Sequence, residues 1–251
     1  MELHYPRKDN GMFILNKNQI DDIATMVHKE YMPQVLEHPQ PVDIDALVVD
    51  GLFLNLEHKT LGYNDAVLGV TAFHDVDDVP CLDDMFRPIT TSMKEGTILI
   101  HSWLQGYQNR PRRRFTVAHE CSHWILHRTY HSPDNQRFTF RTQRWSPYIA
   151  CRSANIEKKQ HILTTDEDWE EWQADTLAAA LLMPFATFNW VAGRLVKNYC
   201  GKRYLTDRVN REYIEIVEEV ANEFRVSKTA AEIRMKQLGF IQKEQRYAYS
   251  Y

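Results

Sequence analysis

The sequence of 251 residues lacks three features that would assign it at once to a large class of proteins. It contains no run of 18 apolar residues, so we expect no conventional membrane-spanning helix. Its formal net charge is -4, which argues against broad electrostatic binding to nucleic acid or to a membrane surface. Its first residues show no apolar stretch behind basic ones, so we expect no signal peptide and no membrane partner.

Cysteine is scarce as well, and the four cysteines are far apart, with no CxxC pair: Cys81, Cys121, Cys151 and Cys200. This spacing favours reduced thiols and predicts a cytoplasmic protein. Cys121 stands between two histidines and could bind a metal or sense oxidants. Its helical position is offset from those histidines, which favours a small structural residue instead.

One stretch, RRRFTVAHECSHWILH at positions 112–127, is dense in metal-binding residues. The absence of glycine and the helical spacing of its apolar residues predict a helix. On a helix, His119 and His123 lie on one face and can direct two imidazoles at one ion. Glu120 lies beside them, within reach of a water bound to that ion. This HExxH pattern is typical of metallopeptidases.

A catalytic zinc site needs a third protein ligand and an open position for water. The segment EWQAD at positions 171–175 places a Glu and an Asp four residues apart on one helical face. We assign Glu171 as the third ligand, because a buried carboxylate in an apolar helix would be costly without a partner. Asp175 would accept the spare ring N–H of a ligating histidine.

The two motifs, RxRFTxAHExxH and ExxAD followed by AAxLLMP, together resemble the ImmA/IrrE family of zinc metallopeptidases, which share the gluzincin ligand pattern. The chain departs from that pattern at Cys121-Ser122, where the family more often has an apolar residue and Gly; neither side chain is a ligand. The matching residues are Arg112, Arg114, Phe115, Thr116, Ala118, His119, Glu120 and His123, then Glu171, Ala174, Asp175, Ala178, Leu181, Leu182, Met183 and Pro184.

The resemblance implies one Zn²⁺ per chain, held by His119, His123 and Glu171, with Glu120 as the catalytic general base. It also implies the substrate: a protein partner, namely a helix-turn-helix transcriptional repressor of a mobile element, a prophage or a stress response. The enzyme would cleave that repressor selectively. No direct contact with nucleic acid is expected.

The remaining pattern predicts an α+β fold, with a small antiparallel or mixed sheet packed on helices. Residues 1–205 would form the metallopeptidase domain, with 1–16 as a loosely ordered arm, and 206–251 a helical segment packed on the same domain. The periodicity predicts helices over 17–32, 42–49 and 164–182 and two between 206 and 240, and strands over 52–57, 67–73 and 97–103.

Two connecting segments bear on function. Residues 75–96 hold several Asp residues without the pattern of a calcium loop, which favours a solvated loop. Residues 130–160 are long and polar, as in a lid or binding loop beside an active site. Tyr148, Arg152 and His161 are candidates for the donor that stabilises the transition state. The resemblance further implies that an extended substrate pairs with the strand at 67–73 or at 97–103.

Two other functions stay open. The C-terminal helices could form a DNA-binding helix-turn-helix beside a structural metal site, although Lys228, Arg234 and Lys236 are accompanied by Glu232 and a packing role is favoured. A structural zinc site would need a fourth protein ligand, and no residue is evidently spaced for it. A peptidase of broad specificity is the third possibility, which casein digestion would separate from a selective enzyme.

Overall fold

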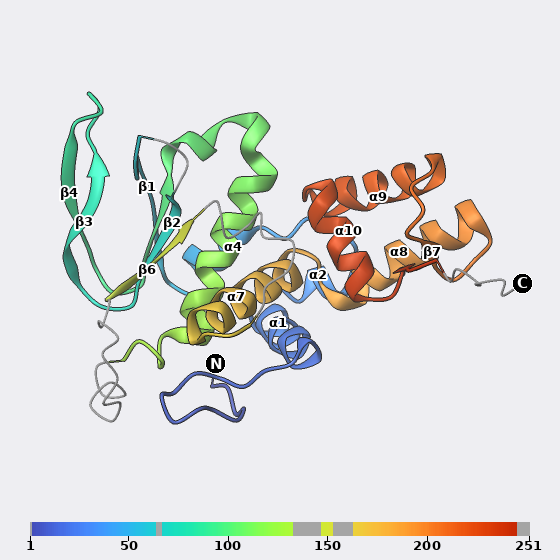
Figure 1. Ribbon diagram of the computed structural model, residues 1–251, viewed down its shortest axis with the longest axis horizontal. Coiled ribbons are helices and arrows are strands. Elements are labelled where there is room, and N and C mark those ends of the chain that lie inside the picture. Colours follow the sequence, from blue (N-terminus) through green and yellow to red (C-terminus); the bar gives the residue numbers. More distant parts are fainter. Residues whose placement is uncertain (1, 64–66, 133–146, 153–162, 245–251) are drawn as a thin grey trace, which may run out of the picture.

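The computed structural model describes residues 2–63, 67–132, 147–152 and 163–244 (Figure 1). It confirms the predicted fold class, because a small mixed sheet packs against helices and further helices follow toward the C-terminus. In Figure 1 the sheet lies on the left, helix α4 stands beside it, and α8, α9 and α10 lie on the right.

The main sheet has the strand order β1-β5-β2-β6. Strand β1 runs parallel to β5, whereas β2 is antiparallel to both β5 and β6. The two inner strands therefore have partners on both sides, and the expectation that one of them receives a substrate is wrong. The edges are β1 and β6. The strands are β1 (Asn55–Lys59), β2 (Val67–Ala72), β5 (Thr97–His101) and β6 (Tyr148–Arg152).

The segment 75–96 was expected to be a solvated loop and is a hairpin of β3 (Val76–Leu82) and β4 (Pro88–Met93). Val79 and Met93 are buried against the main sheet, so the hairpin covers apolar surface. One of its acidic residues, Asp83, supports the turn between the two strands. The Asp83 carboxylate accepts the Met85 and Arg87 backbone N–H groups, each at 2.9 Å.

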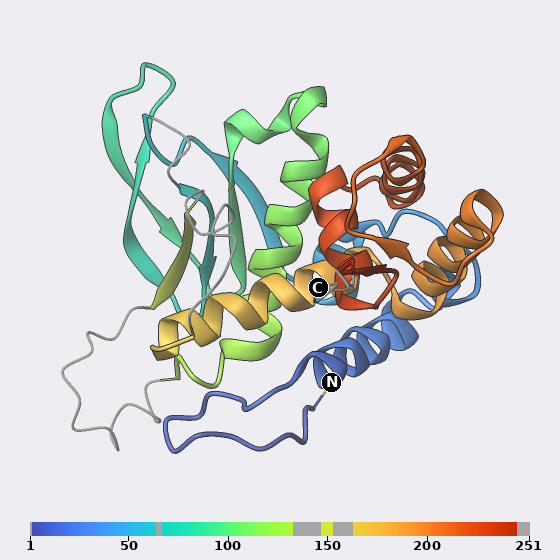
Figure 2. The same ribbon diagram turned by 45° about the vertical axis from the view of Figure 1, so that its right-hand side comes forward.

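Three helices form the layer under the sheet: α1 (Lys17–Tyr31), α4 (Arg110–His127) and α7 (Asp166–Leu182). Helix α7 begins as predicted, where Thr165 and Asp168 form a reciprocal capping box. Helix α7 packs across both α4 and α1 (Figure 2). Shorter helical segments connect these parts: α2 (Gln34–Glu37), α3 (Ile44–Ala46), the π-helical turn η1 (Leu47–Gly51) and the 3₁₀ turns η2 (Ser102–Gln105) and η3 (Tyr107–Asn109).

The C-terminal helices α8 (Phe185–Cys200), α9 (Arg211–Phe224) and α10 (Lys228–Gln237) share one apolar core with α1, α4 and α7. The short strands β7 (Leu205–Thr206) and β8 (Ile241–Gln242) pair beside them. Arg234 on α10 is buried, and its Nη2 donates to Asp21 Oδ1 on α1 at 2.5 Å. Arg114 on α4 donates to the Arg225 carbonyl between α9 and α10 at 3.2 Å. Both arginines therefore hold helices together.

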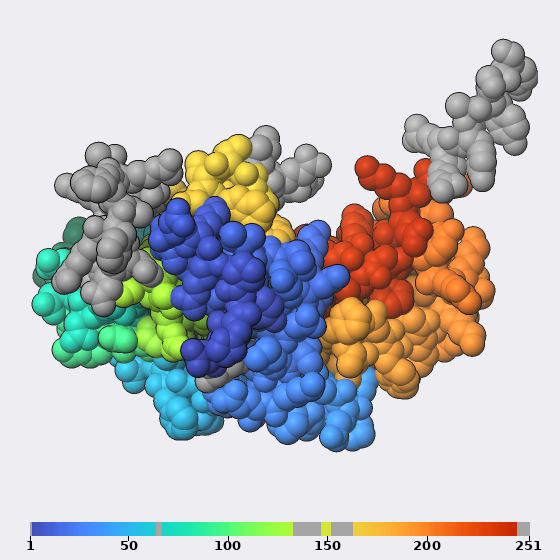
Figure 3. Space-filling view, turned by 90° about the horizontal axis from the view of Figure 1, so that it is seen from below, coloured from blue at the N-terminus to red at the C-terminus, as the bar shows by residue number. Residues whose placement is uncertain are grey.

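The N-terminal segment differs from the loosely ordered arm that the sequence predicts. Met12, Phe13 and Leu15 are buried, because their side chains complete the apolar surface beside α1 and α7. Lys8 also forms an ion pair of 2.7 Å with Asp166 at the start of α7. Figure 3 shows this segment, in dark blue, lying across the middle of one face of the molecule.

Among the described residues, no single helix is long and apolar enough to cross a membrane. Only α7 and α8 taken together meet that criterion, by length and composition, and they are bent by 69° at the break between them.

Candidate metal centre

The packing of α7 across α4 brings the two sequence motifs together, as their resemblance to a metallopeptidase implies. His119 and His123 on α4 and Glu171 on α7 are all buried and form one group that could hold a metal ion, here called the metal triad. The two Nε2 atoms are 2.9 Å apart. The Glu171 oxygens lie 3.6 Å from His119 Nε2 and 3.7 Å from His123 Nε2.

Hydrogen bonds fix the tautomer of each ligating ring. His119 Nδ1 lies 2.9 Å from Asp175 Oδ1, so it must carry the proton, and the lone pair is left on Nε2. Asp175 thus has the role predicted for it.

The tautomer of His123 follows from a series of hydrogen bonds that begins at Gln173. Gln173 Nε2 donates to the Phe13 carbonyl at 2.7 Å, which turns Gln173 Oε1 toward His127 Nε2 at 3.2 Å. His127 Nε2 must then donate, which leaves its Nδ1 as an acceptor for His123 Nδ1 at 3.0 Å. The lone pair of neutral His123 therefore also lies on Nε2.

Two lone pairs that face each other at 2.9 Å repel unless a cation lies between them. In the metal-free protein a proton can take that place. Burial lowers the pKa of His119, but Cys151 and Asp175 outweigh it and raise that pKa well above its usual value. Burial, with the charge of His119, lowers the pKa of His123 well below its usual value.

Behind His123 lies a second group of polar residues, here called the backing cluster: the buried His127, Glu170 and Gln173 and the half-buried His131. Glu170 Oε1 is 2.6 Å from His131 Nε2, 3.7 Å from His127 Nδ1 and 3.8 Å from His123 Nδ1. His123, His127 and Glu170 also satisfy the distance criterion for a metal site. Here, however, the hydrogen bonds already pair the ring nitrogens.

Strand β2 positions the expected base, Glu120. Thr71 donates its hydroxyl to Glu120 Oε2 at 2.6 Å. Two residues earlier on the same face, Gly69 leaves room for this carboxylate, since a Cβ there would lie 2.5 Å from Glu120 Oε1. Burial raises the pKa of Glu120 to about 7, against the opposing effects of His119 and Thr71. The sequence pointed to strand 67–73 as a possible partner for the substrate backbone, but it missed both side-chain positions, because nothing in the strand shows which residues face the metal helix.

Cys151 on β6 is a further residue that the sequence did not point to. Its side chain is fully buried, and its sulfur, one ring nitrogen of His119 and one carboxylate oxygen of Glu120 lie within 4.8 Å of one another. Burial raises the pKa of this thiol to about 11. Cys121, which the sequence placed between the ligands, is buried in α4 and belongs to none of the possible metal-binding groups among the described residues.

Of the three candidates for transition-state stabilisation, Tyr148 is the one whose side chain the structure describes. Tyr148 lies on β6 and packs on the smaller apolar cluster with Val70 and Leu99. It is three positions from Cys151 along the strand, so the two side chains leave opposite faces of the sheet. Arg152 ends β6, and His161 lies outside the described residues. The candidate role of Tyr148 is therefore wrong for this conformation, and the other two remain predictions.

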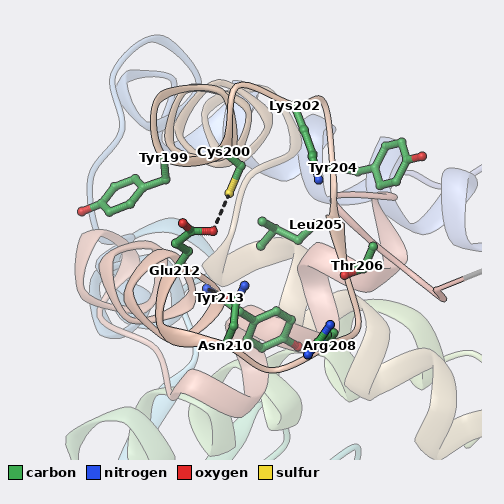
Figure 4. Close-up of a pocket in the computed structure, with 10 residues that line it drawn as sticks. All are labelled: Tyr199, Cys200, Lys202, Tyr204, Leu205, Thr206, Arg208, Asn210, Glu212 and Tyr213. Atoms are coloured by element: carbon green, nitrogen blue, oxygen red, sulfur yellow. Dashed lines mark hydrogen bonds between the residues drawn. The ribbon is translucent and has the colours of Figure 1, made fainter.

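A pocket of about 180 Å³ lies away from this centre, between α8 and α9 (Figure 4). Lys202, Arg208 and Glu212 are among the residues that line it, and none of its lining residues belongs to the metal triad or the backing cluster. Cys200 Sγ lies 3.8 Å from Glu212 Oε2 at its wall.

No model of a known protein family matches the chain, and a search of curated proteins finds no match. The resemblance to the ImmA/IrrE metallopeptidases therefore rests on the two motifs themselves, residue by residue.

Proposed function

We propose that the protein is a zinc-dependent endopeptidase. The observation that carries the proposal is the pair of histidine lone pairs held face to face at 2.9 Å, with a carboxylate completing the triangle. Ligand atoms about 2.0–2.2 Å from a tetrahedral ion lie roughly 3.3–3.6 Å apart, close to the separations in the triad. Two imidazoles and one carboxylate are a donor set that catalytic zinc uses, and they leave one position open.

Zinc bound there would lower the pKa of a bound water toward about 7 and polarise the scissile carbonyl. The chain's own residues supply the rest. Thr71 and Gly69 hold the Glu120 carboxylate beside His119. Glu120 takes a proton from the water and later gives it to the leaving amine. Asp175 keeps the proton of His119 on Nδ1, so that Nε2 stays free for the ion.

We further propose that the substrate is a helix-turn-helix repressor, cleaved selectively in the cytoplasm, as the resemblance implies. The edge strand β6 supports this extension, because it borders the triad through Cys151 and its outer side has no strand partner among the described residues. An extended peptide could add to that side through main-chain hydrogen bonds.

The first test is the metal content of protein purified without chelator, measured by elemental analysis. We expect about one zinc per chain in the wild type and a clear loss in Glu171→Ala. Glu167→Ala, which removes an exposed carboxylate from the same helix, is the matched control and should keep its zinc. A wild type without metal, even after zinc is added, would contradict the proposal. Cleavage of repressors, with casein as the unselective substrate, then tests the substrate.

A second candidate function is a non-catalytic regulator that is stabilised by a closed zinc site and binds DNA or a repressor through its C-terminal helices. Cys151 is a candidate for the fourth donor that this function needs, since its sulfur lies near a ring nitrogen of His119. The burial of Arg234 counts against a DNA-reading α10. Binding to DNA that persists at about 200 mM salt and needs α10 would favour this function over the peptidase.

A further inference from the structure

The Cys151 thiol lies beside the metal triad, in a group that shares His119 with it, yet the proposed mechanism gives this thiol no task. It stands on β6 opposite Gly69 of β2, the residue that makes room for Glu120. Its sulfur lies within 4.8 Å of both a ring nitrogen of His119 and a carboxylate oxygen of Glu120. Cys151 therefore borders the first ligand and the proposed base at once.

The space between a ligand and the general base is where the nucleophilic water has to lie. Glu120 can take a proton only from a water bound on its own side of the ion. The thiol faces this same side, and thiolate is one of the ligands that zinc prefers. Cys151 and water are thus competitors for the fourth coordination position.

The Glu120 carboxylate lies beside the thiol and can accept its proton. Glu120 is fully buried, and its Oε1 has no partner in hydrogen-bonding geometry among the described residues. Within the same described ranges, no possible metal-binding group includes another cysteine. The arrangement is therefore particular to Cys151, and it holds both the donor and the acceptor of the proton that a thiol must lose on binding a metal.

We propose that the Cys151 thiolate is a fourth, exchangeable ligand that holds the resting metal site closed. As the sulfur binds the ion, its proton passes to Glu120 and the water leaves. As the sulfur departs, it takes a proton back and water returns. Strand β6 is paired with β2 alone among the described strands, so a small shift of this edge can withdraw the thiol. The regulation rests on the proposed function, because it requires the metal triad.

Cobalt substitution tests the assignment directly. Thiolate bound to Co²⁺ gives a charge-transfer absorption in the near ultraviolet that histidine and carboxylate ligands do not give. We expect this band in Co²⁺-loaded wild type and its loss in Cys151→Ser and Cys151→Ala. Cys121→Ser, which alters another buried cysteine on the metal helix, is the control and should keep the band. Its absence from cobalt-loaded wild type would overturn the proposal.

Zinc affinity and cleavage test whether the ligand closes the site. Cys151→Ala should bind zinc about tenfold more weakly or worse. Its initial rate of repressor cleavage should also be about tenfold higher than in the wild type, if about nine tenths of wild-type molecules are in the closed state. Equal cleavage rates beside a clear band would overturn the closing role. A band in a protein that cleaves no repressor, even as Cys151→Ser, would instead contradict the peptidase and leave the sulfur ligand established. Metal bound to the wild type without this band would contradict the sulfur ligand and leave the proposed metal triad in place.

Discussion

The metal triad and the neighbouring group of His123, His127 and Glu170 are built from the same kinds of residue on the same two helices, and their dimensions nearly coincide. The closest ring nitrogens are 2.9 Å apart in the triad and 3.0 Å apart between His123 and His127. Their carboxylate distances are 3.6 and 3.7 Å against 3.7 and 3.8 Å. By distance alone, either group could hold a metal ion.

They differ in where the protons are. In the backing cluster, Gln173 obliges His127 to accept a hydrogen bond from His123, so those two nitrogens need no cation. In the triad, Asp175 and His127 draw both ring protons to the far side, and the two lone pairs are left facing each other. On our proposal, the hydrogen bonds made by the outer ring nitrogens, more than the types of ligand, would therefore decide which group takes a metal ion.

The two buried carboxylates of these groups should differ most in their effect on catalysis. Glu120→Gln should keep its zinc but lose at least about 10²-fold in cleavage rate, because it removes the general base. Glu170→Gln, which alters the backing cluster, should stay within about tenfold of wild type when assayed well below its unfolding temperature. Initial rates on the same repressor, with zinc content measured in parallel, make the comparison. A Glu120→Gln variant that cleaves at nearly the normal rate would refute the mechanism.

The space at Gly69 should matter for the base and not for the metal. Gly69→Ala places a Cβ 2.5 Å from Glu120 Oε1, so the carboxylate has to move. We expect up to about 10²-fold slower cleavage, the scale of an ångström-sized misplacement, with zinc content unchanged. Gly106→Ala is the control, because its nearest neighbour would be 3.6 Å away. Loss of zinc in Gly69→Ala would show that β2 supports the triad as a whole.

The hydrogen bond between the two groups should tune metal affinity. His127→Leu removes the acceptor of the His123 Nδ1 proton while keeping a buried side chain of similar size. Zinc affinity, measured by competition with a chelator, should fall about 10- to 100-fold, as is typical when a ligand loses its outer partner. His131→Gln alters the contact with Glu170 and leaves the hydrogen bond of His123 Nδ1 in place, so zinc affinity should fall less. Equal affinities in the two variants would mean that the chain of tautomers does not act on the metal.

A buried histidine outside both groups shows how burial alone affects the pH dependence of stability. His28 on α1 bonds the Leu181 carbonyl at 3.0 Å, and burial lowers its pKa to about 4. Its folded-state pKa lies below the unfolded value near 6.5, so the unfolded chain takes the proton first. Its contribution to stability is complete above about pH 6.5 and is lost as the pH falls toward 4, by at most about 1.4 kcal/mol per pH unit.

Urea unfolding of His28→Gln between pH 4 and 7 checks this smallest effect. The fall in unfolding free energy toward low pH should be shallower than in the wild type. His38→Gln, which changes an exposed histidine, should leave the wild-type slope in place. An unchanged slope in His28→Gln would mean that the ring is already charged in the folded protein.

Local sequence pattern was enough to predict the main helices and the candidate metal ligands. His119 and His123 are four residues apart, as are Glu171 and Asp175, and a helix turns such spacing into a shared face through local geometry alone. The helix predicted over 164–182 is α7, whose first turn is closed by the neighbouring Thr165 and Asp168. Each of these inferences needs only residues within one or two helical turns.

Only the tertiary structure decided what surrounds those ligands. Gly69 and Thr71 meet Glu120 across about fifty residues of chain, and Cys151 reaches it from a strand that the sequence pattern did not reveal. The N-terminal segment completes the network, because the Phe13 carbonyl orients Gln173. These contacts depend on strand register and on helix packing, which bring together residues with no shared period. Spacing along the chain therefore predicts the candidate ligands, whereas packing sets the positions of their protons and brings Glu120 and Cys151 beside them.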